Sequence, residues 1–355
     1  MKLGIIGLPQ AGKTTVFNAL TRGDQPTTMG GGRFEVHTAV VDVPDPRLDA
    51  LSAMFRSKKT IYARVTYADI AGLDGSAARG GISGPLLTEL AQMDGLLLVV
   101  RCFEDPGVPH PNERLDPQRD LDAMLAEFAI NDLITVERKL ERLADERRKG
   151  GGRDRALIQR EDDIFLRLHA VLSEDESLRG LDLSPEEVKT ISGFGFLSRK
   201  PLLVVPNLGE GQPAPSLHIP AGVEIAPLMG RLEMEIAQLP PEEAGIFLEE
   251  YGIEEPGLNR MIKRSLDLLG KITFFTIGDD EVRAWTLKKG SSAPEAAGTV
   301  HTDLQKGFIR AEVIPFEELA ALGSLAAARS QGRLRVEGKD YVVKDGEIVH
   351  IRFNL

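Results

Sequence analysis

The segment at residues 7–14 constrains this chain more than any other. It reads GLPQAGKT and fits the pattern G-x-x-x-x-G-K-[ST]. It lies between a short apolar run at residues 3–6 and a segment at residues 14–20 that reads as a helix. Glycines in such a loop let successive backbone N–H groups turn toward phosphate oxygens, and the next helix presents its positive end. The order of strand, glycine loop and helix predicts a phosphate-binding loop in an α/β fold.

The same loop supplies most of the candidate nucleotide contacts. We expect the Lys13 ammonium group to bind the β- and γ-phosphates and to act in catalysis, and the Thr14 hydroxyl to bind Mg²⁺. A glycine turn with a surface lysine is the alternative, and the flanking strand and helix argue against it. The predicted contacts are Gly7, Leu8, Pro9, Gln10, Ala11, Gly12, Lys13, Thr14 and Thr15.

A second motif, D-x-x-G, follows the apolar run at residues 63–70. Asp69 stands where a strand of an open α/β sheet meets its ligand, so its carboxylate is expected to hold the Mg²⁺. Gly72 is expected to offer its N–H to the γ-phosphate. Ras-like GTPases place a glutamine after this glycine to orient the attacking water. Leu73 has no polar group for that task, so another residue has to perform it.

A third motif follows the predicted strand at residues 201–205. Guanine-specific proteins of this class carry N-K-x-D there, whereas this chain reads NLGE. The lysine is missing, and Glu210 is one methylene longer than aspartate, which misplaces a bidentate grip on guanine. ATP therefore becomes a plausible substrate beside GTP. We predict base contacts from Asn207, Leu208 and Glu210, with a simple turn residue as the alternative for Asn207.

Length and composition set the broad class. A chain of 355 residues suggests two or three domains, and the net charge of -11 argues against a DNA-binding protein. Cys102 is the single cysteine, so no internal disulfide can form, and its apolar surroundings predict a buried structural thiol. Neither an export signal nor a membrane span is indicated. We expect a cytoplasmic protein without a membrane partner.

Two further regions differ from the sheet pattern. Leucine and valine recur three and four residues apart from residue 133 to 170, and GGG at residues 150–152 interrupts them. This predicts two antiparallel helices. Residues 137–160 hold nine basic and five acidic residues, which is either a solvated face or a surface for RNA or a partner protein. After residue 271, short β-like runs at 272–277, 281–287, 308–314 and 347–353 predict a separate small α+β module.

Long stretches match one known family. They read GLPQAGKTTVFNALT, VPDPRLDAL, DIAGL, VVRCFED, NLGE, and FFTIGDDEVRAWTLKKGSSAPEAAGTVHTDLQKGFIRAEVI with GKDYVVKDGEIVHIRFNL. On these segments the chain resembles the YchF/Obg-like ATPase family. The resemblance implies a Ras-like P-loop domain with a doubly wound sheet, an inserted antiparallel helical hairpin and a C-terminal ubiquitin-like TGS domain. The implied boundaries are 1–133 and 197–272 for the nucleotide-binding domain, 134–196 for the hairpin and 273–355 for the TGS domain.

The resemblance also implies a function. Members favour ATP through N-x-x-E, use Mg²⁺, and associate with ribosomes or ribosomal RNA, so a role in translation or stress response is expected. His110 falls where a family histidine is proposed to orient the attacking water; an exposed loop histidine between Pro109 and Pro111 is the alternative. Met229 stands in the loop that lies against the base in the family.

Departures from the family pattern fall at the chemistry. Arg33 stands where we align the family's magnesium-binding threonine of the first switch, and Thr27, Thr28 or Thr38 are the candidates to replace it. The second switch is one residue shorter than usual. A divergent member with slow hydrolysis fits these changes. A GTP-preferring enzyme and a non-hydrolysing adaptor that holds RNA or protein remain as alternatives.

Overall fold

The computed structural model describes residues 1–26, 36–70, 82–110, 114–149, 152–251, 255–278 and 280–354. The chain forms two compact units, Met1–Ala39 with Thr66–Leu258 and Val40–Val65 with Asn259–Leu355. The sequence predicts residues 40–65 as part of the nucleotide-binding domain, whereas in the structure they group with the C-terminal unit. The reason is local pairing, because strand β3 (Lys59–Ile61) runs parallel to β9 (Glu281–Lys288).

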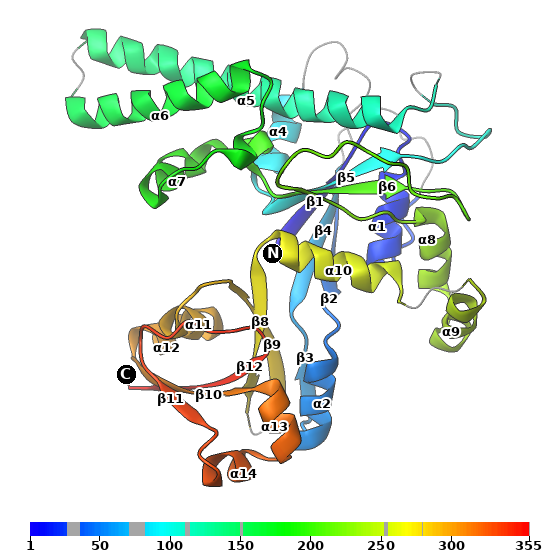
Figure 1. The fold of residues 1–355 in the computed structure, drawn as a ribbon, viewed down its shortest axis with the longest axis vertical. Helices are drawn as coiled ribbons and strands as arrows, with labels where there is room; N and C mark the ends of the chain where they lie inside the picture. Colours follow the sequence, from blue (N-terminus) through cyan, green and yellow to red (C-terminus); the bar gives the residue numbers. More distant parts are fainter. Residues whose placement is uncertain are drawn as a thin grey trace. The chain divides into compact units, whose positions relative to one another are not determined.

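A six-stranded sheet forms the centre of the first unit, in the order β2-β4-β1-β5-β6-β7 (Figure 1). The pairs β1–β4, β1–β5, β5–β6 and β6–β7 are all parallel. Parallel neighbours require crossover connections, which place helices on the faces of the sheet. The strands are β1 (Lys2–Ile6), β2 (Val36–Asp42), β4 (Arg64–Ile70), β5 (Gly95–Arg101), β6 (Leu202–Asn207) and β7 (Val223–Ile225).

Both faces of this sheet are covered. The buried run of β5 contributes Leu96, Leu98 and Val100 to a core with α4 (Gly84–Ala91) and α5 (Pro117–Lys149). Helices α1 (Lys13–Thr21) and α8 (Gly230–Gln238) pack against each other. Near-continuous apolar strands are the signature of such two-sided burial. The predicted α/β fold with a doubly wound sheet is confirmed.

Helices α5 and α6 (Arg155–Ser173) lie side by side as a hairpin (Figure 1). Helix α5 ends at Lys149 and α6 begins at Arg155. Val136, Phe165 and Leu168 are buried between the helices, which explains their spacing. Helix α5 begins much earlier than residue 134, at Pro117, because its first turns pack on the sheet of the nucleotide-binding unit.

Charges along the hairpin are partly paired. Lys139 Nζ lies 2.6 Å from Glu161 Oε2, and the Arg147 guanidinium donates to both oxygens of Asp162 at 2.8 and 3.0 Å. Part of the local positive charge is thus neutralised within the hairpin. The remaining helices of this unit are α7 (Pro185–Ile191) and α9 (Pro241–Glu250), with short 3-10 turns at Leu178–Gly180, Ser192–Phe194 and Leu197–Arg199.

The second unit contains another six-stranded sheet, in the order β11-β10-β12-β8-β9-β3. Its strands are β8 (Lys271–Ile277), β9, β10 (Phe308–Pro315), β11 (Arg335–Glu337), β12 (Glu347–Phe353) and β3. Four of them coincide within a residue or so with the β-like runs read from the sequence. Helix α11 (Ala293–Val300) buries its alanines against one face. The other helices are α2 (Pro46–Phe55), α12 (Thr302–Lys306), α13 (Phe316–Leu322) and α14 (Leu325–Ser330), and α10 (Gly257–Leu268) spans the boundary between the units.

Within the described residues, no helix is both long enough and apolar enough to cross a lipid bilayer.

Candidate nucleotide-binding site

The loop between β1 and α1 has a backbone that only glycine permits at two positions. A Cβ atom on Gly7 would lie 2.3 Å from the Val99 carbonyl oxygen. A Cβ on Gly12 would lie 2.2 Å from Asn207 Nδ2, and Gly12 also has a φ of 89°. Gln10 adopts a left-handed conformation as well, with a φ of 62°. Alternating backbone conformations of this kind turn N–H groups inward and create an anion-binding concavity.

Lys13 folds back over this loop. Its Nζ donates to the carbonyl oxygens of Gly7 and Leu8, both at 3.0 Å. Burial lowers the pKa of Lys13 to about 8, and the nearby Asp69 carboxylate opposes that shift. The ammonium group therefore lies at the opening of the phosphate loop, where a ligand could replace its two carbonyl partners. A phosphate oxygen would be a stronger partner than either carbonyl.

Thr14 and Asp69 lie next to each other, as the two motifs predict. The Thr14 hydroxyl donates to Asp69 Oδ2 at 2.7 Å. Asp69 is 3% exposed, and its Oδ1 is buried without a hydrogen-bond partner among the described residues. Desolvation raises the pKa of this carboxyl group, while the hydrogen bond from the Thr14 hydroxyl and the charges of Lys13 and His37 lower it. An orphaned buried carboxylate oxygen beside a hydroxyl is the donor set that a hard divalent cation prefers.

Asn207 has a structural part beside its predicted contact with the base, which remains a prediction. It is 3% exposed and its side chain bridges two loops. Nδ2 donates to the Ala11 carbonyl at 3.0 Å, and Oδ1 accepts from the Gly230 N–H at 3.1 Å. The amide thus braces the phosphate loop against the loop that precedes α8, and the alternative of a simple turn residue does not hold.

Leu208 and Gly209 of the NLGE segment are also held in place. Leu208 is 8% exposed and belongs to the core of the sheet, and Met229 packs against that same core. The Gly209 N–H donates to Gln212 Oε1 at 3.0 Å. Glu210 is exposed. Glu210 is the most exposed of the predicted base contacts, and the Tyr251 hydroxyl hydrogen-bonds to its carboxylate.

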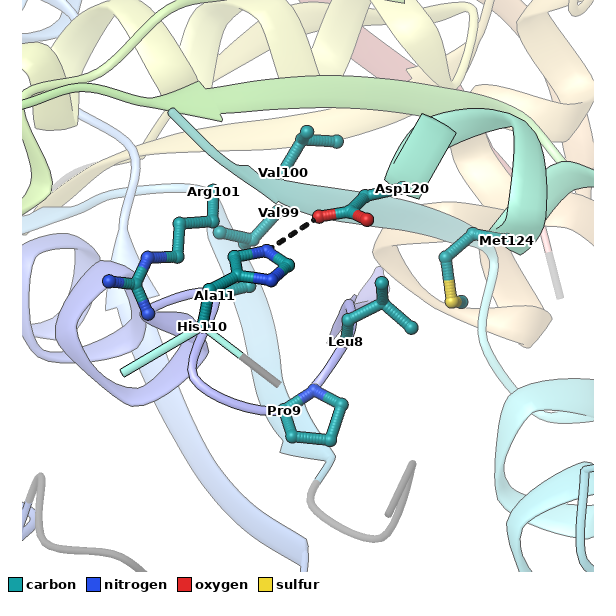
Figure 2. A pocket seen from close by; sticks show the side chains of 9 residues that line it. All are labelled: Leu8, Pro9, Ala11, Val99, Val100, Arg101, His110, Asp120 and Met124. Carbon is teal, nitrogen blue, oxygen red and sulfur yellow. Dashed lines mark hydrogen bonds and ion pairs between the residues drawn. The ribbon is translucent and has the colours of Figure 1, made fainter. Parts of the chain in front are cut away.

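His110 lies against the phosphate loop and is not exposed. Its side chain retains 7% exposure, and Nε2 lies 2.9 Å from Asp120 Oδ2 (Figure 2). Both residues line a small cavity of about 10 Å³ with Leu8, Pro9 and Ala11 of the loop. The alternative of an exposed loop histidine is thereby excluded. Sequence reasoning missed Asp120, because it placed the start of this helix near residue 133, whereas α5 begins at Pro117.

Two of the other predicted residues lie in the described part of the chain. Thr15 is half-buried in the first turn of α1, directly after Thr14, and Thr38 is exposed on β2. Gly72 and Leu73 of the second motif lie outside the described residues, as do Thr27, Thr28 and Arg33 of the first switch. In the described part of the chain, no group of three or more histidine, cysteine, aspartate or glutamate side chains is arranged to hold a metal.

Two family models match this chain. Residues 2–139 match a model described as a 50S ribosome-binding GTPase. Residues 271–354 match the model YchF-GTPase_C, described as a protein of unknown function. Together the two models include both the phosphate loop and the C-terminal sheet.

Individual relatives match over nearly the whole chain. The ribosome-binding ATPase YchF of Pasteurella multocida is 39% identical, over 100% of this chain and 99% of the relative. The protein of the same name from Bacillus subtilis is 37% identical over 99% of both chains. Obg-like ATPase 1 of Oryza sativa is 33% identical over 100% of this chain and 92% of its own. The solved structure of the Schizosaccharomyces pombe YchF GTPase matches with a TM-score of 0.82 and 30% identity, covering 99% of this chain and 97% of that one.

Proposed function

The chain belongs to the YchF family, and from this we propose that it is a ribosome-associated switch that binds and hydrolyses ATP. It is a P-loop nucleoside triphosphatase. The observation that carries the proposal is the loop at Gly7–Thr14, whose backbone concavity is closed at its mouth by the Lys13 ammonium group. Lys13→Ala is expected to abolish tight ATP binding. Retention of affinity within a few-fold of the parent protein would remove the assignment.

Thr14 and Asp69 are the residues that we propose to hold Mg²⁺. Their adjacency and the orphaned Asp69 Oδ1 support this. Bound there, the ion would neutralise charge on the β- and γ-phosphates. Asp69→Asn keeps the shape but removes the charge, so the dependence of ATP affinity on Mg²⁺ concentration should be lost. An unchanged magnesium titration would count against the site.

His110 is the residue that we propose to orient the attacking water. Leu73 is apolar and cannot do so, and the imidazole lies against the loop that is expected to hold the phosphates. A neutral imidazole can accept a proton from water through its unprotonated nitrogen. The expected result is that His110→Ala lowers the rate of single-turnover ATP hydrolysis and leaves ATP affinity unchanged.

Base preference rests on Glu210. It stands at the end of NLGE and is exposed, and its carboxylate accepts a hydrogen bond from the Tyr251 hydroxyl that a base would have to compete with. We propose that ATP is preferred over GTP, because the longer side chain mispositions the bidentate grip that guanine needs. Titration with fluorescent ATP and GTP side by side measures the ratio. Glu210→Asp should move that ratio toward GTP, whereas a parent protein that binds GTP more tightly would establish a GTPase.

We propose ribosome binding because the relatives are named ribosome-binding ATPases, and we propose a cytoplasmic location for the same reason. We propose that the α5–α6 hairpin and residues 273–355, taken as a TGS domain, make the contacts. The many exposed basic side chains near the hairpin tip support this. Co-sedimentation with ribosomes with and without an ATP analogue tests the switch. Absence of phosphate release from ATP both with and without ribosomes, with ribosome binding retained, would instead establish a non-hydrolysing adaptor.

A further inference from the structure

We propose that Asp120 is a positioning residue for the hydrolysis step, acting through His110. This inference rests on the proposed role of His110 and adds the group that controls it. The two side chains form a buried pair, with 7% and 5% exposure and 2.9 Å between Nε2 and Oδ2 (Figure 2). Because both side chains are buried, water does not readily replace Asp120 as a partner of the ring. The orientation of the imidazole therefore depends on this carboxylate.

Asp120 is itself held in place. Its Oδ1 accepts two hydrogen bonds from the Arg119 guanidinium, at 3.1 Å from Nε and 2.9 Å from Nη2. Arg119 also donates to the Arg114 carbonyl oxygen at 2.9 Å. The backbone of Asp120 lies in the first turn of α5, whose following residues are buried in the core of the sheet. The Asp120 carboxylate is therefore held in a fixed position beside the phosphate loop.

The loop that carries His110 is fastened on its other side by Arg101. This side chain is 4% exposed and lies at the end of β5. Its Nε donates to the Phe103 carbonyl at 3.1 Å, and its Nη2 donates to the Val108 carbonyl at 2.7 Å. Because Arg101 donates these hydrogen bonds to the backbone, it orders the loop that carries His110. The anchored loop and the contact with Asp120 both constrain where the imidazole ring lies.

Asp120 also selects the tautomer of the ring. A carboxylate accepts a hydrogen bond from Nε2–H, so the contact at 2.9 Å favours a ring that carries a proton on Nε2. The cavity of about 10 Å³ beside the ring has room for about one water molecule. Asp120 therefore sets the direction of the His110 ring and favours the form with a proton on Nε2.

The decisive experiment measures single-turnover hydrolysis of ATP by the full-length protein and its variants. Asp120→Asn keeps the size of the side chain but removes the charge that selects the tautomer. We expect its rate to fall by about tenfold or more, with ATP affinity unchanged. Asp122→Asn is the matched control, because Asp122 is exposed two residues along the same helix and bonds Gln118 instead. Its rate should equal that of the parent protein.

A double-mutant cycle separates positioning from a general structural role. If Asp120 acts through His110, adding Asp120→Asn to His110→Ala should cause no further loss of rate. Rate losses that multiply in the double variant, or a faster Asp120→Asn variant, would overturn the inference. A normal rate for Asp120→Asn beside a slow His110→Ala would overturn it while leaving the proposed role of His110 intact. A normal rate for His110→Ala would remove both.

A measurement on the unmodified protein guards against misfolded variants. Nitrogen-15 NMR of labelled histidine reports which ring nitrogen carries the proton. We expect the His110 signals, identified by their loss in His110→Ala, to show protonation at Nε2. Protonation at Nδ1, or rapid averaging between the two nitrogens, would overturn the inference without any kinetic result.

Discussion

The affinity for ATP should fall as the pH rises through the titration of Lys13. Its Nζ is held by the Gly7 and Leu8 carbonyl oxygens at 3.0 Å, and burial lowers its pKa from 10.5 to about 8. When a triphosphate binds, its negative charge favours the ammonium form and returns the pKa of Lys13 toward its ordinary value. At a pH between these two pKa values, Lys13 is protonated in the complex and deprotonated in the protein alone. Binding is then linked to proton uptake, and it weakens with increasing pH.

The size of the effect follows from the pKa of about 8. At about pH 9.5 roughly 97% of the lysine would be neutral in the protein alone, so ATP affinity should be about 30-fold weaker than at about pH 7. This corresponds to about 2 kcal/mol of binding free energy. The terminal phosphate loses its last proton at about pH 6 to 7, so its own titration does not contribute to the decline.

Calorimetric titration with Mg²⁺ and ATP across this range is the assay. Repeating it in buffers of different ionisation enthalpy counts the protons taken up. The control is Lys13→Met, which should bind weakly with a pH-independent affinity over the same range. If the parent protein binds ATP equally well at both ends of the range, or takes up no proton, the account of Lys13 is wrong.

Three further predictions concern the frame of the site. Gly12→Ala should lower the free energy of unfolding, measured by urea titration, by about 1–3 kcal/mol, because the new Cβ would meet Asn207 Nδ2 at a backbone of positive φ. In the same measurement the control Gly245→Ala, whose Cβ would have nothing within 4 Å, should stabilise α9 by about 0.5–1 kcal/mol. Asn207→Ala removes two buried hydrogen bonds and should lower the unfolding free energy by about 2–4 kcal/mol together with ATP affinity; equal stability would refute its bracing role. Burial raises the pKa of the Cys102 thiol to about 12, so a thiol reagent should label it after unfolding in guanidinium and not before.

The parts that the sequence predicted well are those in which each residue's role depends on its near neighbours. Lys13 and Thr14 lie in one contiguous string whose strand and helix are visible as apolar patterns. Asp69 ends a buried strand, and parallel strands deliver their carboxyl ends to one edge of the sheet, so its meeting with Thr14 followed from topology. The short strands of the C-terminal sheet were equally accessible, because turn residues separate them.

Roles that depend on partners far along the chain could not be obtained in this way. Asn207 reads as part of a base-recognition motif, and that motif does not show that its amide also bonds Ala11, 196 residues away. Residues 40–65 read as a continuation of the nucleotide-binding domain, because nothing local announces that β3 pairs with β9. Periodicity marks a buried helix face but gives no warning of an isolated polar contact between distant segments.

Asp120 shows why such a contact matters for assigning chemistry. Ten residues separate it from His110, and the cavity that both line is completed by the phosphate loop near the start of the chain. The motif alone supplied a histidine of suitable chemistry, with an exposed position as the alternative. The fold supplies the carboxylate that fixes its tautomer and the arginine that fixes its loop. A catalytic role for His110 therefore depends on a carboxylate that no quoted motif contains and on an arginine whose contact with the loop the VVRCFED motif does not reveal, which is why the cycle of His110 and Asp120 variants is more decisive than either substitution alone.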